Sequence, residues 1–210
     1  MKRSHDFLPV IAAVFFCASV HGADTATDAE RDALKATVQT CGACHGINGR
    51  SVSPAFPNLA AQMAAQMAAY LELQLKAFKD QSRADPDAQA YMWGMASQLS
   101  DSQIKALAAY FAAQPAAPGR SGNPALVAQG KQIFDQGVPA RQIPPCASCH
   151  GPNAEGQAFF PRLAGQHAPY LLRQLIVIQS VLRTAPVMHG VIKDLTRDQM
   201  QAVVVYLESR

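Results

Sequence analysis

A short pattern, Cys-x-x-Cys-His, occurs twice in this 210-residue chain and constrains its fold more than any other feature. The first copy runs from Cys41 to His45 and the second from Cys146 to His150, and a glycine follows each copy. Two cysteines three residues apart lie on one face of a helical turn, and the histidine follows them directly. The fold must therefore bring two thiols and an imidazole together in two separate places.

This pattern is the attachment signature of c-type haem. The two thiols can reach the two vinyl groups on one porphyrin edge, and the histidine can give a nitrogen to the iron. A redox disulfide pair would need a βαβ context, which is missing, and a zinc site does not explain why histidine follows both pairs. We therefore expect two covalently bound haem c groups. Their attachment and proximal-ligand residues are Cys41, Cys44, His45, Cys146, Cys149 and His150.

The two motifs belong to a longer internal repeat. Matching segments follow them in the same order and at similar spacing, namely 56–60 with 160–164, 70–75 with 170–175, 92–94 with 188–190 and 99–100 with 195–196. This order indicates a tandem duplication. The first half carries four extra residues near 61–67, which predicts one additional helical turn there.

The fold class predicted from these segments is all-α. Apolar residues recur at helical spacing, and Ser100 and Thr196 are good N-caps for the last helix of each half. The expected helices are 27–43, 60–79, 101–113, 124–136, 167–182 and 197–209. No run of alternating residues predicts a strand, and the Gly-, Pro- and Asn-rich segments after the motifs predict loops.

The predicted domain organisation follows from the repeat and from one breaker-rich segment. We expect a first domain at 23–114, a linker at 115–123 and a second domain at 124–210, because proline and glycine at the density seen in the linker break helices. Residues 1–22 are expected to be a cleaved secretory signal, in which a charged start precedes an apolar run of about 14 residues, short for a membrane span.

Export would place the protein in the periplasm. Cys17 would be lost with the signal, and removal of Lys2, Arg3 and Asp6 would change the formal net charge from +3 to +2. The chain has no dense run of Lys or Arg, so we expect no nucleic-acid binding.

The candidates for the second axial ligand of each iron can be narrowed by counting the histidines and methionines in each half. Two of the six histidines, His5 and His21, belong to the signal, so the first half retains only His45 and cannot form a bis-histidine site. The remaining candidates are Met63, Met67, Met92 and Met95 in the first half and His167, His189, Met188 and Met200 in the second.

The repeat selects Met92 and Met188, because each lies seven residues before a matched leucine. The other methionines are expected to be core filler, and His167 is expected at a helix start. His189 is the main rival of Met188, although its counterpart, Trp93, cannot ligate iron. Thioether ligation raises the reduction potential. It also closes the sixth position, which favours electron transfer over catalysis, and we expect no catalytic residues.

These residues resemble the cytochrome c4 family of diheme c-type cytochromes over about residues 27–210. The resemblance implies two tandem class I cytochrome c-like domains packed face to face, with electron transfer towards a terminal oxidase. It also implies that Pro57 and Pro161 lie beside the proximal histidines, where a backbone carbonyl would orient the imidazole. The alternative, that each proline only breaks a loop, stays open.

The leading functional hypothesis is therefore a periplasmic electron carrier. Its donor would be a quinol-oxidising complex or a dehydrogenase, its acceptor a terminal oxidase, and a peripheral association with the inner membrane stays open. Three alternatives remain: a cytochrome subunit of a membrane-associated dehydrogenase complex, a diheme peroxidase-type enzyme, and a zinc- or disulfide-stapled binding module. A peroxidase would need an iron that can open, usually through a histidine that leaves, and the first half has no spare histidine.

Overall fold

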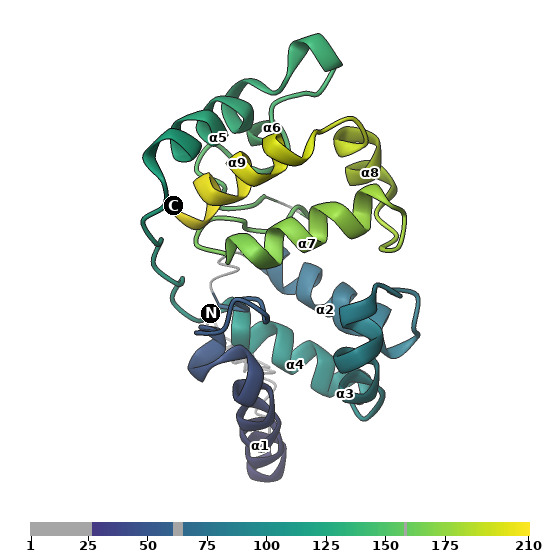
Figure 1. Ribbon diagram of the computed structural model, residues 1–210. Coiled ribbons are helices and arrows are strands. Elements are labelled where there is room, and N and C mark those ends of the chain that lie inside the picture. Colours follow the sequence, from purple (N-terminus) through teal and green to yellow (C-terminus); the bar gives the residue numbers. More distant parts are fainter. Residues whose placement is uncertain (1–26, 61–64, 158) are drawn as a thin grey trace, which may run out of the picture.

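A computed structural model describes residues 27–60, 65–157 and 159–210 of the chain. The predicted signal, 1–22, lies outside the described residues, and so do residues 61–64 of the predicted extra turn. Figure 1 shows two groups of helices stacked on each other, with the first half of the chain below and the second half above. Each group corresponds to one copy of the repeat.

The first repeat begins its outer helices at side-chain caps. Its elements are α1 (Asp28–His45), the 3-10 turn η1 (Ile47–Gly49), α2 (Ala65–Lys79), the π-helical segment η2 (Ala88–Met92), α3 (Trp93–Ser97) and α4 (Asp101–Ala112). Thr27 caps α1 and Ser100 caps α4, each in a reciprocal pair with the residue three positions on. The cap predicted at Ser100 is confirmed.

The second repeat follows a segment without helix that joins α4 to α5. Its elements are α5 (Pro124–Gln136), the 3-10 turn η3 (Pro139–Arg141), α6 (Ala147–His150), α7 (Ala168–Gln179), α8 (Pro186–Ile192) and α9 (Arg197–Glu208). Asn123 caps α5, whose first residue is a proline, and Thr196 caps α9 as predicted. These caps satisfy backbone N–H groups that lack partners within the first turn.

The all-α prediction is confirmed. The predicted helix at 124–136 has the observed bounds of α5, and the other predicted helices agree with the observed ones to within a few residues over the described range. The described residues contain no strand beyond two isolated bridges, Val138 with Ile143 and Gln157 with Phe160. The short elements η2, α3, α6 and α8 are additions to what the sequence predicts.

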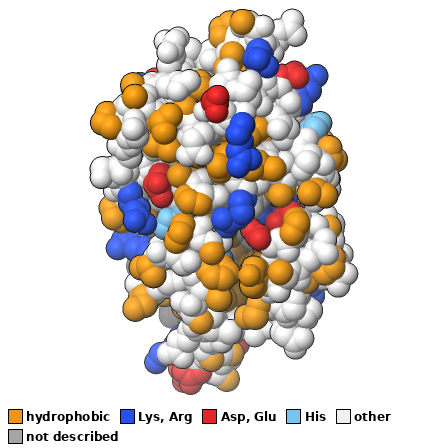
Figure 2. All heavy atoms as spheres, viewed as in Figure 1, with side chains coloured by type: hydrophobic (Ala, Val, Ile, Leu, Met, Phe, Trp, Pro, Cys, Tyr) orange, Lys and Arg blue, Asp and Glu red, His pale blue; other side chains and the backbone are white. Residues whose placement is uncertain are grey.

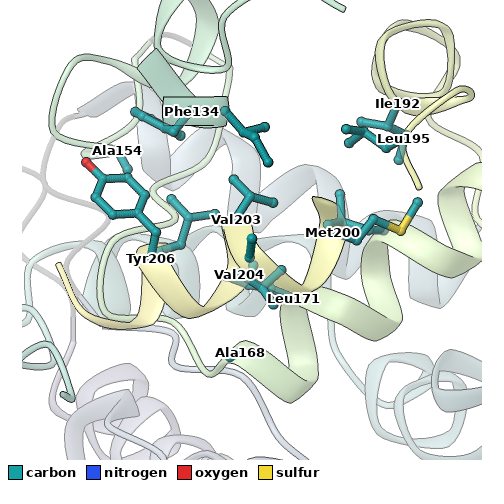
Figure 3. Packing of buried hydrophobic residues seen from close by; sticks show 14 of the residues in the cluster. Phe134, Ala154, Ala168, Leu171, Ile192, Leu195, Met200, Val203, Val204 and Tyr206 are labelled. Carbon is teal, nitrogen blue, oxygen red and sulfur yellow. The ribbon is translucent and has the colours of Figure 1, made fainter. Parts of the chain in front are cut away.

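The core of the second repeat lies where α5 crosses α9. Gly130 makes this crossing close, because a Cβ atom there would lie 2.1 Å from the backbone oxygen of Ala202. Phe134 from α5 packs on Tyr206 from α9, with ring centroids 5.5 Å apart (Figure 3). Met200, near the start of α9, belongs to the same cluster. This core holds the haem-motif segment against the C-terminal helix.

The repeats differ around the motif and in the segment that precedes the methionine. In the first repeat, α1 runs straight through the motif, whereas in the second α5 ends at Gln136 and the motif lies on the separate short helix α6. The segment between the matched residues Arg83 and Met92 is also four residues longer than that between Arg183 and Met188. The longer segment contains η2, which ends at Met92, whereas Met188 is the third residue of α8.

The repeats meet along α2 and α7, which lie next to each other in Figure 1. Arg83, just after α2, donates a hydrogen bond to Gln174 of α7, and Arg183, just after α7, donates to Tyr70 and Gln74 of α2. The contacts are therefore arranged almost symmetrically about the middle of the interface. The face-to-face packing of the two domains is as expected.

Candidate haem-binding sites

The first motif lies on the last turns of α1. Cys41 is half-buried and Cys44 is exposed, and both are free thiols. His45, the last residue of the helix, is buried. Gly46 then ends the helix with φ of +76°, and a Cβ atom on it would lie 2.0 Å from the carbonyl oxygen of Arg50. The chain therefore needs glycine directly after the histidine in order to turn back beneath it.

The second motif spans α6. Cys146 immediately precedes this helix, and Cys149 and His150 lie within it. Both cysteines are half-buried free thiols, and His150 is buried. Gly151 has φ of +80°, like its counterpart Gly46 in the first repeat. Thus two different helical settings present the same set of side chains.

The histidine of each motif contacts the backbone of the matched proline. His45 Nδ1 lies 2.9 Å from the carbonyl oxygen of Pro57, and His150 Nδ1 lies 2.9 Å from that of Pro161. A carbonyl oxygen can only accept a hydrogen bond, so Nδ1–H is the donor and Nε2 is left with its lone pair. The carbonyl contact that the resemblance implies for Pro57 and Pro161 is confirmed.

A phenylalanine packs on each of these imidazoles. Phe56 lies edge-on to His45 and Phe160 edge-on to His150, each with ring centroids 6.1 Å apart. Since the carbonyl bond fixes the tautomer and the aromatic ring fixes the orientation, each imidazole is held before any metal is bound.

Burial shifts the pKa values of the histidines and of two of the cysteines in the motifs. It lowers the pKa of His45 and of His150, against the opposing effect of the carbonyl bond, so the imidazoles are neutral near pH 7. Burial also raises the pKa of the Cys41 thiol, and it raises that of Cys146 to about 11. Reactive redox cysteines have lowered pKa values. The environment of Cys41 and Cys146 is therefore unlike that of a thioredoxin-type disulfide pair.

Met92 and Met188 occupy corresponding places in the two repeats. Met92 is half-buried and packs on the small cluster of Phe78, Ala88 and Ala96, while Met188 is half-buried against the core of the second repeat. Both come from short helical elements that follow the long interface helices. The two methionines therefore have similar settings in the two repeats, and their binding to iron stays a prediction.

Of the other methionines, the structure confirms the predicted core position for Met200 and contradicts it for Met95. Met95 points outward, with 43% of its surface exposed, whereas Met200 is 1% exposed within the core (Figure 3). The side chains of Met63 and Met67 lie outside the described residues.

The two other histidines of the second repeat each contact a backbone carbonyl oxygen through one ring nitrogen. His167 is buried at the N-cap of α7, the helix start predicted for it, and its Nε2 lies 2.9 Å from the carbonyl oxygen of Ser51 in the first repeat. His189 Nδ1 lies 3.0 Å from the carbonyl oxygen of Ile178. In the described part of the chain, no group of three or more His, Cys, Asp or Glu side chains is placed to hold a metal ion. A multi-residue zinc site therefore has no support there.

The donor sets present fit haem c at both motifs. Each motif offers two free thiols and a neutral, oriented imidazole whose Nε2 is available. Thiolate–vinyl attachment with a histidine nitrogen on the iron requires this combination.

Sequence reasoning missed the polar groups between the repeats. Asn58 N–H donates to Gln166 Oε1, and Gln166 Nε2 donates back to the carbonyl oxygen of Asn58, both at 2.9 Å. The arginine and glutamine pairs could have been found, since Gln74 with Gln174 and Arg83 with Arg183 are each 100 positions apart. No signal in the repeat indicates the Asn58–Gln166 pair.

The charge distribution of the surface and the apolar content of the helices bear on what the protein could bind. Figure 2 shows Lys and Arg side chains interspersed with Asp and Glu on the face in view, without a broad area of one sign. Among the described helices, none has the length and apolar content needed to span a bilayer.

Comparison with known proteins agrees with the geometry. The Cytochrome c family model matches twice, at residues 32–114 and 127–210. Cytochrome c-552 of Acidithiobacillus ferridurans is 43% identical over 171 residues, which cover 80% of this chain and 73% of that protein. The solved structure of Acidithiobacillus ferrooxidans cytochrome c4 superimposes with a TM-score of 0.76 at 42% identity, covering 82% of this chain and 99% of that one.

One further relative has a more specific name. The thiosulfate dehydrogenase electron acceptor of Thiomonas intermedia is 35% identical over 178 residues, which cover 81% of this chain and 78% of that protein.

The two family matches, one on each repeat, agree with the two sets of thiol and imidazole donors. The chain therefore belongs to the cytochrome c family, as a diheme electron carrier of the cytochrome c4 kind with two covalently bound haem c groups.

Proposed function

We propose that this chain is a periplasmic electron carrier with two histidine–methionine haem sites. Four cysteines attach the two porphyrins, two histidines are the proximal ligands and two methionines close the sixth positions. These residues are Cys41, Cys44, His45 and Met92 in the first domain, 23–114, and Cys146, Cys149, His150 and Met188 in the second domain, 124–210. The linker is 115–123.

The observation that carries this proposal is the matched pair of imidazole–carbonyl contacts. His45 and His150 come from helices of different length and context, yet each donates Nδ1–H over 2.9 Å to the carbonyl of the matched proline. An imidazole held in this way keeps Nε2 facing one direction and makes it a better donor to iron. Two independent helical settings converge on one ligand geometry.

Haem supplies one-electron chemistry, since its iron passes between the ferric and ferrous states. The cysteines would hold the porphyrins covalently, and His45 with Met92 and His150 with Met188 would bind the two irons. An iron bound by both a histidine and a methionine would have no free position for peroxide. The two remaining histidines of the second repeat, His167 and His189, each hydrogen-bond to a backbone carbonyl oxygen, that of Ser51 and that of Ile178.

We propose that the carrier passes electrons towards a terminal oxidase and that residues 1–22 direct export to the periplasm. Similarity to the cytochrome c4 of Acidithiobacillus ferrooxidans, whose structure is described in terms of electron transfer, supports the carrier role. The test uses reduced holoprotein, which is mixed rapidly either with oxidase-containing membranes or with hydrogen peroxide. Rapid oxidation by the membranes and no peroxide turnover are expected. Turnover of peroxide with no oxidation by the membranes would overturn the proposal.

A second candidate function is that of the direct electron acceptor of a thiosulfate-oxidising dehydrogenase. Its support is the similarity to the Thiomonas intermedia protein, which spans most of both chains. Purified thiosulfate dehydrogenase and thiosulfate are mixed with oxidised holoprotein. Rapid reduction of both haems would favour this donor, whereas reduction only by a quinol-oxidising complex would favour the respiratory one. A peripheral association with the inner membrane is tested by co-sedimentation in the same preparations.

A further inference from the structure

The residue directly after each proposed axial methionine makes the same kind of hydrogen bond in both repeats. Trp93 follows Met92, and its indole Nε1–H donates to the carbonyl oxygen of Arg83 over 2.9 Å. His189 follows Met188, and its Nδ1 lies 3.0 Å from the carbonyl oxygen of Ile178. Because a carbonyl only accepts, Nδ1–H is the donor there as well. Two chemically different rings therefore donate an N–H to a carbonyl near the end of the preceding interface helix, although Arg83 and Ile178 are not matched positions of the repeat.

These bonds connect the methionine-bearing segments to the long helices of the interface. Trp93 is the first residue of α3, and Arg83 lies a few residues after the end of α2. His189 lies in the middle of α8, and Ile178 is in the last turn of α7. Helices as short as α3 and α8 are marginal in isolation. Their position must therefore be fixed by contacts to neighbouring elements.

In the first repeat the acceptor is itself immobilised. The Arg83 side chain is buried and donates to Asp85, Gln74 and Gln174, and its own N–H donates to Ala77 at the end of α2. A carbonyl on such a residue is a rigid point of attachment for the indole. Trp93 also packs on the small apolar cluster that includes Phe78.

In the second repeat a second tie supports the same helix. The Gln179 side-chain Nε2 lies 3.0 Å from the carbonyl oxygens of Ile192, Lys193 and Leu195, at the end of α8. The matched residue in the first repeat is Lys79, which pairs instead with Asp101. The position of α3 thus depends more on its ring N–H bond than the position of α8 does.

We propose that Trp93 and His189 are positioning residues, whose ring N–H groups hold Met92 and Met188 against the interface helices so that each thioether stays on its iron. This inference rests on the proposed function, since it assumes methionine ligation. It also gives His189 a role that the sequence left open, that of a hydrogen-bond donor to Ile178. This bond leaves Nε2 free, and the His189 variants distinguish positioning of Met188 from ligation of iron by His189 itself.

The test compares variants that remove the donor with one that keeps it. Trp93→Phe keeps an aromatic ring without N–H, and His189→Leu removes the donor in the second repeat. His189→Asn retains an N–H near the position of Nδ1. Met95→Leu is the control on α3, since Met95 is exposed. The readouts are the near-infrared band of methionine bound to ferric iron, each reduction potential and the affinity for added imidazole.

Each variant has a distinct expected outcome. In Trp93→Phe we expect imidazole to bind the first haem about tenfold more tightly, since one hydrogen bond contributes about that much. In His189→Leu the second haem should gain only about threefold, because Gln179 still holds α8. His189→Asn and Met95→Leu should resemble the wild type. These shifts identify positioning, because a purely structural role would lower thermal stability without moving them.

Two results would overturn the inference. Unchanged bands, potentials and imidazole affinities in both Trp93→Phe and His189→Leu would show that the bonds do not position the methionines. Absence of a methionine band for the second haem in the wild type, together with a changed spectrum of that haem in both His189→Leu and His189→Asn, would make His189 itself the ligand. A Met188→Ala variant distinguishes failure of this inference from failure of the proposed function. An unchanged spectrum in that variant would refute methionine ligation itself.

Discussion

Arg83 Nη2 donates a 2.9 Å hydrogen bond to Gln174 Oε1, which joins the end of α2 in the first repeat to the middle of α7 in the second. The same oxygen accepts a bond from Arg183 Nη1, so one glutamine receives an arginine from each repeat. Two buried guanidinium groups share this interface, and Asp85 is the carboxylate that pairs with Arg83. The relative placement of the repeats therefore depends on a hydrogen-bonded charge network.

Replacing Arg83 with Met should be costly. It leaves Asp85, which is 1% exposed, without its cation, and breaking a buried ion pair typically costs about 3–5 kcal/mol. Denaturant unfolding of the holoprotein measures the loss. The control is Arg173→Met, which removes the more exposed pair with Asp87 and should cost no more than about 1 kcal/mol. Equal losses in the two variants would show that burial of the network is unimportant.

Replacing Gln166 should weaken the contact between the repeats in two steps. Gln166→Glu keeps an acceptor for the Asn58 N–H but loses the donor to its carbonyl, while Gln166→Leu loses both bonds. Each buried polar group left unpaired costs about 1–3 kcal/mol. We expect proteolysis of the 115–123 segment to be slowest in the wild type, faster in Gln166→Glu and fastest in Gln166→Leu. Identical digestion of all three would argue against an interface held by this pair.

Replacing Gly130 with Ala should destabilise the second domain selectively. The new Cβ would lie 2.1 Å from the Ala202 carbonyl oxygen, so α5 and α9 would have to separate. Overpacking of this kind costs about 1–3 kcal/mol. Calorimetry is the measurement, with exposed Gln129→Ala as the control on α5. A melting temperature for Gly130→Ala equal to that of Gln129→Ala would contradict the close crossing.

The proline carbonyls should set the haem potentials. A hydrogen bond from Nδ1 increases the donor strength of the imidazole and stabilises ferric iron. Pro57→Ala loosens the loop that carries the carbonyl for His45, and Pro161→Ala does so for His150. Each variant should raise one potential and leave the other in place, as measured by spectroelectrochemistry. Pro54→Ala, in the same loop but exposed, should change neither potential.

Much of the fold follows from local sequence signals. α5 lies where the sequence predicts it because Asn123, Pro124 and a terminal glycine mark its ends, and α4 and α9 begin at capping pairs. The methionine-bearing elements have no such signals. η2 and α8 are short and contain few apolar repeats, so periodicity cannot identify them, and tertiary contacts such as Trp93 with Arg83 specify them instead.

In the candidate site, too, some residues follow from local sequence signals and others depend on tertiary contacts. The thiols and imidazoles could be identified from spacing alone, and the repeat pointed to Met92 and Met188. The carbonyl contacts of Pro57 and Pro161 came from the family resemblance, and the structure contains both. The bond between Asn58 and Gln166 joins residues 108 positions apart, and no local pattern encodes such a pairing.

The axial ligands are tested most directly by near-infrared magnetic circular dichroism of the oxidised holoprotein beside its Met92→Ala and Met188→Ala variants. Met95→Leu and Met200→Leu are the controls, because one side chain is exposed and the other lies in the core. We predict two methionine–iron signals in the wild type and in both controls, and one signal in each alanine variant. Two intact signals in either alanine variant would contradict the assignment of that methionine.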